Sequence, residues 1–251
     1  MLKILGVSRS GYRSFLHRKV SPSRQRKERI KKDIRKIYDN SKQNYGAPKI
    51  TQELRKSGQA IGQRTVSKYM REMGIRAQWT KPKTTTTRNS SFSKELHNIL
   101  NEPFNPDRPN AVWCTDITYI RTQNGFIYLN CIMDLYARKI IAWTLAETME
   151  VSTVIETINK AKACRNTEQP LIIHSDRGSQ YVSNAWRDAT VKMHRSYSHS
   201  GYPYDNACME SFHSLIKREW LNRFNIMNYK HAYRLVFEYI ETFYNTVRIH
   251  S

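Results

Sequence analysis

The chain has 251 residues, of which 39% are hydrophobic and 11% aromatic, so it is long enough for one large or two small domains with buried cores. Its 42 lysines and arginines outnumber 21 aspartates and glutamates, and the net charge of +21 points to an anionic polymer such as nucleic acid as partner. The longest apolar runs are far shorter than the ~18–20 residues of a membrane-spanning helix, and early arginines do not fit a signal peptide.

The positive charge is concentrated in the first part of the chain. Residues 1–100 contain 25 Lys and Arg against 6 Asp and Glu, whereas residues 101–251 contain 17 against 15. The resulting net charges, +19 and +2, predict a polyanion-binding module followed by a near-neutral globular domain. We place the basic module at 1–76, a basic linker at 77–105 and the globular domain at 106–251.

Helical patterns fill the basic module. Apolar periodicity and capping residues predict four helices, over residues 8–19, 24–38, 48–58 and 63–73. In the fourth helix, apolar residues at i, i+4 and i+7 predict a buried stripe of Val66, Met70 and Met73. Four candidate DNA contacts lie off that stripe: Arg64, Ser67, Lys68 and Arg71.

A helix-turn-helix with a basic second helix is how many proteins enter the major groove of DNA. The last two predicted helices have this order, and the whole module is strongly basic, so we expect DNA binding through the fourth helix. The alternative is a solvated basic face on an ordinary small helical bundle.

The globular domain has a different pattern. Alternating apolar residues predict strands at 111–121, 126–135, 139–145, 171–175 and 194–198, with a hairpin turn at Asn124-Gly125. Helices are predicted over 151–165, over 184–193 and from Asp205 or Asn206 to Trp220. A last helix is expected to bury a stripe of Tyr233, Val236, Phe237, Ile240, Phe243, Tyr244 and Val247. Three antiparallel strands followed by alternating helix and strand predict a mixed α/β sheet with helices packed on it.

Three acidic residues of this domain occupy unusual positions. Asp116 lies within a strand, where Asp is disfavoured; Asp176 ends an apolar strand; Glu210 is in the first turns of a helix. Each has an ordinary alternative: an outward-facing strand residue, a turn former and a favourable charge at a helix N-terminus. Together they predict carboxylates that converge on a divalent cation, since Mg²⁺ prefers oxygen ligands and a pair of such ions can promote phosphoryl transfer.

Long segments around these acids carry a family resemblance. The three core motifs of the IS3 family of bacterial insertion-sequence transposases resemble residues 113–119 (WCTDITY), 174–181 (HSDRGSQY) and 205–212 (DNACMESF). Residues 244–250 are similar to the closing motif of that family. The resemblance is to the family's second reading-frame product, and it covers nearly the whole chain, including the helix-turn-helix segment.

The resemblance implies a fold and a site. The fold would be α/β, a ribonuclease H-like mixed sheet with flanking helices, preceded by the all-α helix-turn-helix module. The catalytic core would be retroviral-integrase-like, with an Asp-Asp-Glu triad of Asp116, Asp176 and Glu210 that binds Mg²⁺, for which Mn²⁺ can substitute. The basic residue seven positions after the Glu, here Lys217, would contact DNA near the active site.

The expected function is that of a DNA transposase. Water attacks a phosphodiester at the end of the element, and the freed 3′-OH attacks another phosphodiester. The expected partners are the terminal inverted repeats and target DNA, bound by a homo-oligomer in the bacterial cytoplasm and nucleoid, with no membrane involved. The alternatives are a transposase-derived DNA-binding protein or repressor, and a nuclease with the same fold.

The first residues predict that the active enzyme is longer than this chain. Leu2, Ile4 and Leu5 begin an apolar helical pattern, and the turn at Gly6 resembles the middle of a helix-turn-helix, so its first helix is incomplete. In the resembled family, the active enzyme is a fusion with the upstream reading-frame product, which supplies another helix-turn-helix and a multimerisation helix. The alternative is that residues 1–20 form a short independent helix.

Several further residues have expected structural roles. Cys114 and Cys131 have apolar flanks and are predicted to be buried thiols, and the four cysteines lack zinc-finger spacing. His174 and His199 are expected to be structural or close to DNA. Asp205 is expected to cap a helix rather than to bind metal.

Overall fold

The computed structural model describes residues 6, 8–17, 20–78, 97–100, 105–165, 169–199 and 203–249. The chain divides into two compact units, residues 1–78 and residues 79–251. Most of the predicted linker lies outside the described residues. Residues 1–5, on which the predicted upstream fusion depends, also lie outside them.

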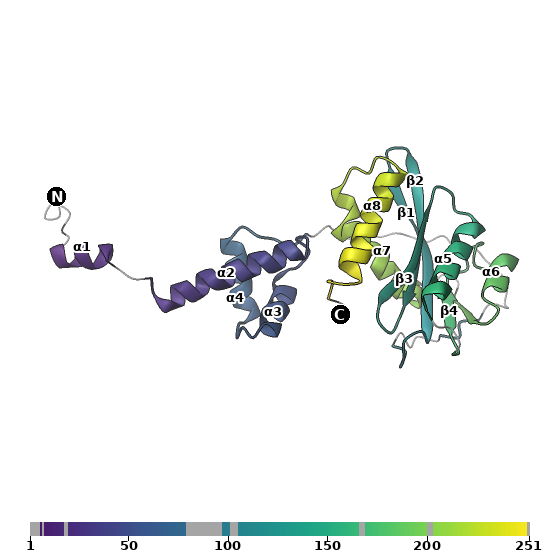
Figure 1. The fold of residues 1–251 in the computed structure, drawn as a ribbon, viewed down its shortest axis with the longest axis horizontal. Helices are drawn as coiled ribbons and strands as arrows, with labels where there is room; N and C mark the ends of the chain where they lie inside the picture. The colour runs from purple at the N-terminus through teal and green to yellow at the C-terminus, as the bar shows by residue number, and fades with distance from the viewer. Residues whose placement is uncertain are drawn as a thin grey trace. The chain divides into compact units, whose positions relative to one another are not determined.

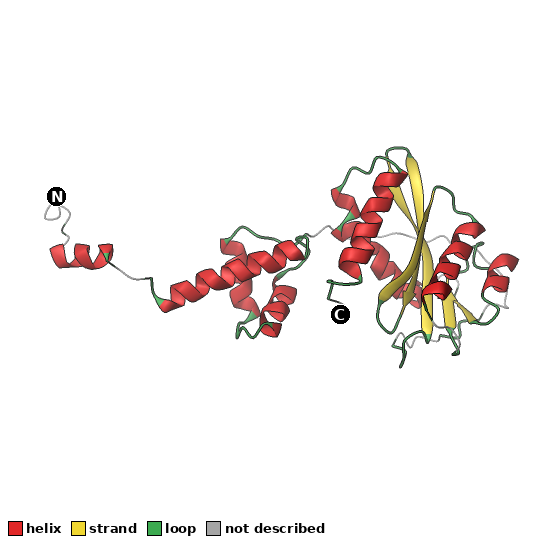
Figure 2. Ribbon diagram, viewed as in Figure 1, coloured by secondary structure: helices red, strands yellow, loops and turns green. Residues whose placement is uncertain are grey.

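The first unit is entirely helical in its described part (Figures 1 and 2). Its helices are α1 (Arg9–Leu16), α2 (Pro22–Asn40), α3 (Ala47–Lys56) and α4 (Gln63–Glu72). Ser8 caps α1 as predicted, since its hydroxyl accepts the Gly11 N–H at 3.0 Å. This helix ends at Leu16, earlier than predicted, and buries none of its residues.

Helices α2, α3 and α4 enclose the core of the first unit. Its fully buried apolar side chains include Ile34, Ile50, Leu54 and Val66. The predicted stripe of α4 is confirmed at Val66 and Met70, whereas Met73 at the helix end is only half-buried. Gly74 follows with φ of 67°, the left-handed backbone that ends helices and that glycine adopts without strain. The segment from α3 to α4 is therefore the predicted helix-turn-helix.

Glu72 joins α4 to α2 through two lysines, at 2.7 Å from Lys27 and 2.9 Å from Lys31. The hydrogen bonds from these lysines lower the pKa of Glu72 from 4.5 to about 2. A folded-state pKa below the unfolded one gives stability that is complete above pH 4.5 and is lost as the pH falls toward 2. We therefore expect the stability difference between the wild type and Glu72→Gln to shrink over this range in urea unfolding. Equal pH dependences of the two proteins would show that the contact does not stabilise the fold.

The second unit is built on a five-stranded mixed sheet with strand order β3-β2-β1-β4-β5 (Figures 1 and 2). The strands are β1 (Val112–Thr122), β2 (Gly125–Asp134), β3 (Lys139–Ala146), β4 (Ile172–Ser175) and β5 (His194–Tyr197). Strands β1 to β3 are antiparallel, whereas β4 runs parallel to β1, and β5 parallel to β4. This is the predicted ribonuclease H-like arrangement.

Helices cover both faces of the sheet (Figure 1). Helices α5 (Val151–Cys164) and α6 (Asn184–Ala189) cover one face, over a core that includes Trp113 and Trp186. Helix α7 (Ala207–Glu219) contacts β1, and so does α8 (Tyr229–Tyr239). Short helical turns complete the chain: η1 (Pro203–Asn206), η2 (Leu221–Arg223) and η3 (Ile240–Tyr244), of which η3 is π-helical. Over the described residues, no helix combines the length and the apolar character needed to cross a membrane.

The stripe predicted for the last helix is partly wrong. Val236, Ile240, Phe243 and Tyr244 are buried as expected, but Tyr233, Phe237 and Val247 are each 45–47% exposed. The stripe buried in α8 is instead Ala232, Leu235, Val236 and Tyr239, which is equally periodic. After α8 the π-helical turn changes the periodicity, so Val247 leaves the buried face.

Residues of the closing motif, 244–250, bind the end of the chain to β3 and α7 of the second unit. Asn245 bonds to both backbone groups of Ile140 in β3, accepting the N–H at 3.0 Å and donating to the carbonyl at 2.9 Å. Arg248 donates two hydrogen bonds to Glu219 of α7, at 3.0 and 2.9 Å, and these side chains are only 9% and 11% exposed. Tyr239 donates a further bond of 2.7 Å to the same carboxylate.

Replacing Arg248 by alanine is expected to lower the free energy of unfolding by about 3–5 kcal/mol, because it leaves a nearly buried carboxylate without its counter-charge. Arg248→Lys should recover part of this loss, since lysine keeps the charge but not the two-pronged geometry. Urea unfolding of the full chain measures both. A loss below about 1 kcal/mol for Arg248→Ala would place this pair among ordinary surface contacts.

Candidate active site and DNA-binding face

Strands β1 and β4 bring Asp116 and Asp176 together. Their parallel register ends with Cys114 opposite His174, and β4 itself ends at Ser175. Asp116 lies two residues beyond Cys114 and Asp176 two residues beyond His174, so the two acids follow the last paired residues of neighbouring parallel strands. Because β1 runs on past the end of β4, the two acids lie where the sheet opens an unpaired edge.

Helix α7 carries Glu210 along this edge. The start of α7 and its side chains contact β1 in sequence order. Asn206, just before α7, donates from Nδ2 to Thr115 O at 3.3 Å. Within α7, His213 Nδ1 lies 3.4 Å from Asp116 Oδ2, and Lys217 Nζ donates to Thr118 Oγ1 at 2.6 Å. Glu210 precedes His213 by one turn and Lys217 by two, so all three share a helix face. These contacts align Glu210 with the part of β1 that holds Asp116.

The charge of Asp116 links the three carboxylates. Loss of solvent is the main cause that raises the pKa of Asp176 to about 6, and the charge of Asp116 adds to it, although Asp176 keeps an exposed outer surface. The same two causes, in the same order, raise the pKa of Glu210. Two carboxylates whose ionisation is opposed by loss of solvent and by a third carboxylate lie in surroundings that favour a cation.

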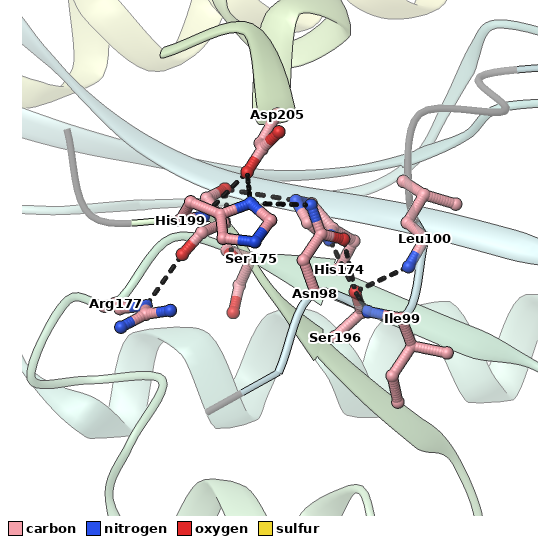
Figure 3. Close-up of polar contacts among 10 residues, drawn as sticks. Asn98, Ile99, Leu100, His174, Ser175, Arg177, Ser196, His199 and Asp205 are labelled. Carbon is pink, nitrogen blue, oxygen red and sulfur yellow. Dashed lines mark hydrogen bonds and ion pairs between the residues drawn. The ribbon is translucent and has the colours of Figure 1, made fainter. Parts of the chain in front are cut away.

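The loop after β4 holds Asp176 closely. The Gly178 N–H donates to Asp176 Oδ1 at 2.9 Å. A Cβ at position 178 would lie 3.1 Å from that oxygen and 3.2 Å from Gln180 Oε1, so a larger residue would push the carboxylate away. Arg177 Nε donates to Ser198 O at 2.7 Å and ties the loop to the end of β5 (Figure 3).

A buried polar network lies beside this loop (Figure 3). His174 is fully buried, and its ring nitrogens lie 2.9 Å from Ser196 Oγ and 3.1 Å from Ser198 Oγ. Burial lowers the pKa of His174 to about 4, so the ring is neutral at physiological pH. The backbone N–H groups of Ile99 and Leu100 also donate to Ser196 Oγ. His174 thus has a structural role, one of the two that were expected.

The expectation that Asp205 caps α7 is wrong. Asp205 is buried, and its Oδ2 accepts the His199 N–H at 2.7 Å and contacts His199 Nδ1 at 2.8 Å (Figure 3). Asn206 occupies the N-cap position, but its side chain bonds to β1 rather than to the helix. The short turn η1 precedes α7, and Asp205 therefore bonds to the preceding loop. His199 remains half-exposed and is held by this pair.

His213 is a site residue that the sequence patterns did not single out. It is 7% exposed, and in the described part of the chain its Nε2 has no hydrogen-bond partner. A buried imidazole against a carboxylate limits the orientations of that carboxylate. Its spacing of one helical turn from Glu210 was the available signal.

The carboxylates do not form a ready-made metal cage. Across the segments that the structure describes, no three His, Cys, Asp or Glu side chains are arranged to bind one ion. The chemistry of the donor set nevertheless fits a hard divalent cation, since it consists of carboxylate oxygens, the ligands that Mg²⁺ prefers.

The predicted DNA contacts of the first unit lie on one side of α4. Arg64, Lys68 and Arg71 are exposed, and Ser67 is half-buried between them. The preceding turn is held by side chains of α2 and α3: Arg26 donates to Ala60 O at 2.9 Å and Arg55 to Ile61 O at 3.0 Å. The helix-turn-helix thus presents an exposed basic face. Lys217 belongs to the second unit, at the carboxylate site.

The buried cysteines agree with expectation. Cys114 and Cys131 are free and fully buried, and burial raises the pKa of both thiols well above the ordinary value. They are therefore inert core residues of β1 and β2.

Family models match almost the whole chain. An integrase core domain model matches residues 106–202, and a second integrase core domain model matches residues 191–251. An HTH-like domain model matches residues 25–83, which include α4.

Curated relatives are similar along their full length. The transposase for insertion sequence element IS904 of Lactococcus lactis is 34% identical over 94% of each chain. Transposase InsF for insertion sequence IS3A of Escherichia coli is 33% identical over 100% of this chain and 88% of its own. A 31 kDa protein of insertion element IS600 from Shigella sonnei is 34% identical over 100% and 93%. Among solved structures, the HTLV-2 integrase catalytic core in complex with magnesium is similar over 57% of this chain and 91% of its own. The TM-score is 0.43 and the sequence identity 16%.

Proposed function

The chain belongs to the IS3 family of DNA transposases and has a DDE-type integrase core, and from this premise we propose that it cuts and joins DNA at the ends of an insertion sequence through Asp116, Asp176 and Glu210. The observation that carries the proposal is the coupling of these carboxylates. They come from β1, the end of β4 and α7, and loss of solvent, with the charge of Asp116 as the second cause, raises the pKa of the other two.

The proposed reaction is two successive phosphoryl transfers. In the first, the oxygen of water forms a bond to phosphorus and the bond from phosphorus to the 3′ oxygen breaks, which frees a 3′-OH. In the second, that 3′-OH bonds to a phosphorus of the target and displaces the 3′ oxygen of the target strand. No bond is oxidised or reduced, so positioning and charge are the main contributions of the protein.

The three carboxylates would hold a divalent cation, Mg²⁺ or Mn²⁺. Such a cation supplies positive charge to the phosphate and favours ionisation of the attacking hydroxyl. His213 restricts the orientation of Asp116, and the Gly178 N–H restricts that of Asp176. Lys217, on the same face of α7 as Glu210, would contact a phosphate of the bound DNA.

The exposed face of α4 would bind the terminal inverted repeat. Arg64, Lys68 and Arg71 supply the side chains for the major groove and its phosphates, and Ser67 adds a hydroxyl. Two ends must be cut and joined, so we expect at least two copies of the chain to act together on the DNA.

Incubation of the chain, alone and fused to the upstream reading-frame product, with labelled terminal-repeat DNA, a target plasmid and Mg²⁺ tests this function. We expect cut ends and joined products that depend on the metal and disappear with EDTA. A DNA-binding repressor on the same fold would shift the labelled DNA in a gel but form neither product, and that outcome would overturn the proposal.

A further inference from the structure

Two exposed aromatic rings lie close to the carboxylate site. Tyr119 of β1 is 54% exposed and Phe126 of β2 is 53% exposed. Their ring centroids are 5.4 Å apart, with planes at 83°. We call these two residues the aromatic pair.

Lys217 connects the aromatic pair to the carboxylates. Its ammonium group lies 4.4 Å from the centroid of the Tyr119 ring and donates to Thr118 Oγ1 at 2.6 Å. Burial lowers the pKa of Lys217, and the charge of Asp116 acts in the opposite direction. One lysine thus lies against both the aromatic pair and the site where DNA would be cut.

The surroundings of the aromatic pair favour an anionic ligand. Arg121 is exposed, lies two residues after Tyr119 on the same face of β1, and stands opposite Phe126 in the β1–β2 register. With Lys217, it places cationic groups on two sides of the aromatic rings. Rings with flanking cations are how proteins bind single-stranded nucleic acid, whose bases stack on the rings while phosphates meet the cations.

Tyr119 follows Asp116 by three residues, an odd spacing that directs the two side chains to opposite faces of β1. The connection between the aromatic pair and the carboxylates is therefore Lys217, which bonds to Thr118 and lies over the Tyr119 ring.

We propose that the aromatic pair stacks an unpaired base of the DNA strand that enters the active site, on the side marked by Lys217. The proposal rests on the proposed function, because it takes DNA at the carboxylates as given. The ligand is a nucleotide splayed from the duplex end, held by ring stacking and by Lys217 and Arg121. Every base has a flat face, so this site is expected to tolerate any sequence.

Affinity for two DNA ends tests the proposal. Full-length protein is titrated in EDTA, which prevents cutting, against a terminal-repeat duplex with three unpaired nucleotides at its end and against the fully paired duplex. Tyr119→Ala and Phe126→Ala should each weaken binding of the unpaired end about 5- to 150-fold, the effect of about 1–3 kcal/mol per stacked base. Tyr119→Phe keeps the ring and should bind like the wild type.

A matched control and a direct probe accompany the titration. Phe237 is an exposed aromatic on the outer side of α8, 47% exposed, and Phe237→Ala should leave both affinities unchanged. With 5-iododeoxyuridine at each of the last nucleotides, irradiation should cross-link the wild type through the peptide that contains Tyr119 or Phe126.

Equal binding of the unpaired end by wild type, Tyr119→Ala and Phe126→Ala would overturn the stacking site, whether or not the protein cuts DNA. Cross-links confined to other peptides would overturn it as well. If instead both alanine variants lose affinity for the unpaired end while the wild type forms no cut product with Mg²⁺, the stacking site stands and the proposed catalysis fails.

Discussion

Replacing Glu210 by glutamine, or Asp116 by asparagine, is expected to reduce DNA cutting and joining by about 10³-fold or more, equivalent to about 4 kcal/mol of transition-state stabilisation. The amide keeps the size of the side chain but loses the charge that holds a divalent cation. Binding of terminal-repeat DNA should stay nearly unchanged, because neither substitution touches the exposed face of α4. Gel shift and product formation on the same labelled DNA measure the two effects separately.

The matched control for this experiment is Glu156→Gln. Glu156 is an exposed glutamate of α5, with 55% of its side chain exposed and an ion pair to Lys160 in the next turn. Its substitution removes the same charge at a distance from the carboxylates and should leave the reaction unaffected. Near-normal joining by either Glu210→Gln or Asp116→Asn would show that the triad is assigned to the wrong residues.

Replacing Arg64 and Lys68 together by alanine should produce the next largest effect, on DNA binding. A base-reading arginine contributes about 1–3 kcal/mol and its loss relaxes the sequence preference, whereas a lost phosphate contact weakens all sequences alike. Each phosphate contact also contributes about −0.9 to the slope of log affinity against log salt concentration. Titrations of terminal-repeat and unrelated DNA at several salt concentrations distinguish these two contributions.

Lys160→Ala is the control for charge in this second experiment. Lys160 is 49% exposed on α5, outside the helix-turn-helix, so its loss should change neither the affinity nor the salt slope measurably. Unchanged affinity and unchanged slope in the Arg64/Lys68 double variant would exclude this face of α4 as the DNA contact.

Local patterns were sufficient to predict most of the second unit's sheet. Apolar alternation and the Asn124-Gly125 turn predicted the β1–β2 hairpin, in which Gly125 has a φ of 120° that glycine adopts readily. The end of the chain was harder, because two sets of residues in α8 were equally periodic. Only packing against the sheet selects Ala232 and Leu235 over Tyr233 and Phe237.

Asp116 and Asp176 stood out in the sequence because one contradicts a strand preference and the other ends a strand, whereas Glu210 stood out as the third acid and through the resembled motif. Their neighbours did not, because the contacts are made between distant segments. His213 reads as an ordinary helical residue until α7 is placed against β1. Tyr119 and Phe126 read as typical strand residues, and only the position of Lys217 relates them to the site. Asp205 resembled a cap because the η1 turn before α7 leaves no clear sequence signal.

The central claim is that three separate segments hold one divalent ion. Its most direct test replaces Mg²⁺ with Fe²⁺ and generates hydroxyl radicals with ascorbate and peroxide. Radicals formed at a bound ion cut the nearby backbone, and the cuts can be mapped on the full chain. We predict cuts near Asp116, Asp176 and Glu210, all suppressed together by excess Mg²⁺ and all weakened in Glu210→Gln. Cuts at only one of these segments, or cuts elsewhere that Mg²⁺ does not suppress, would contradict a shared metal site.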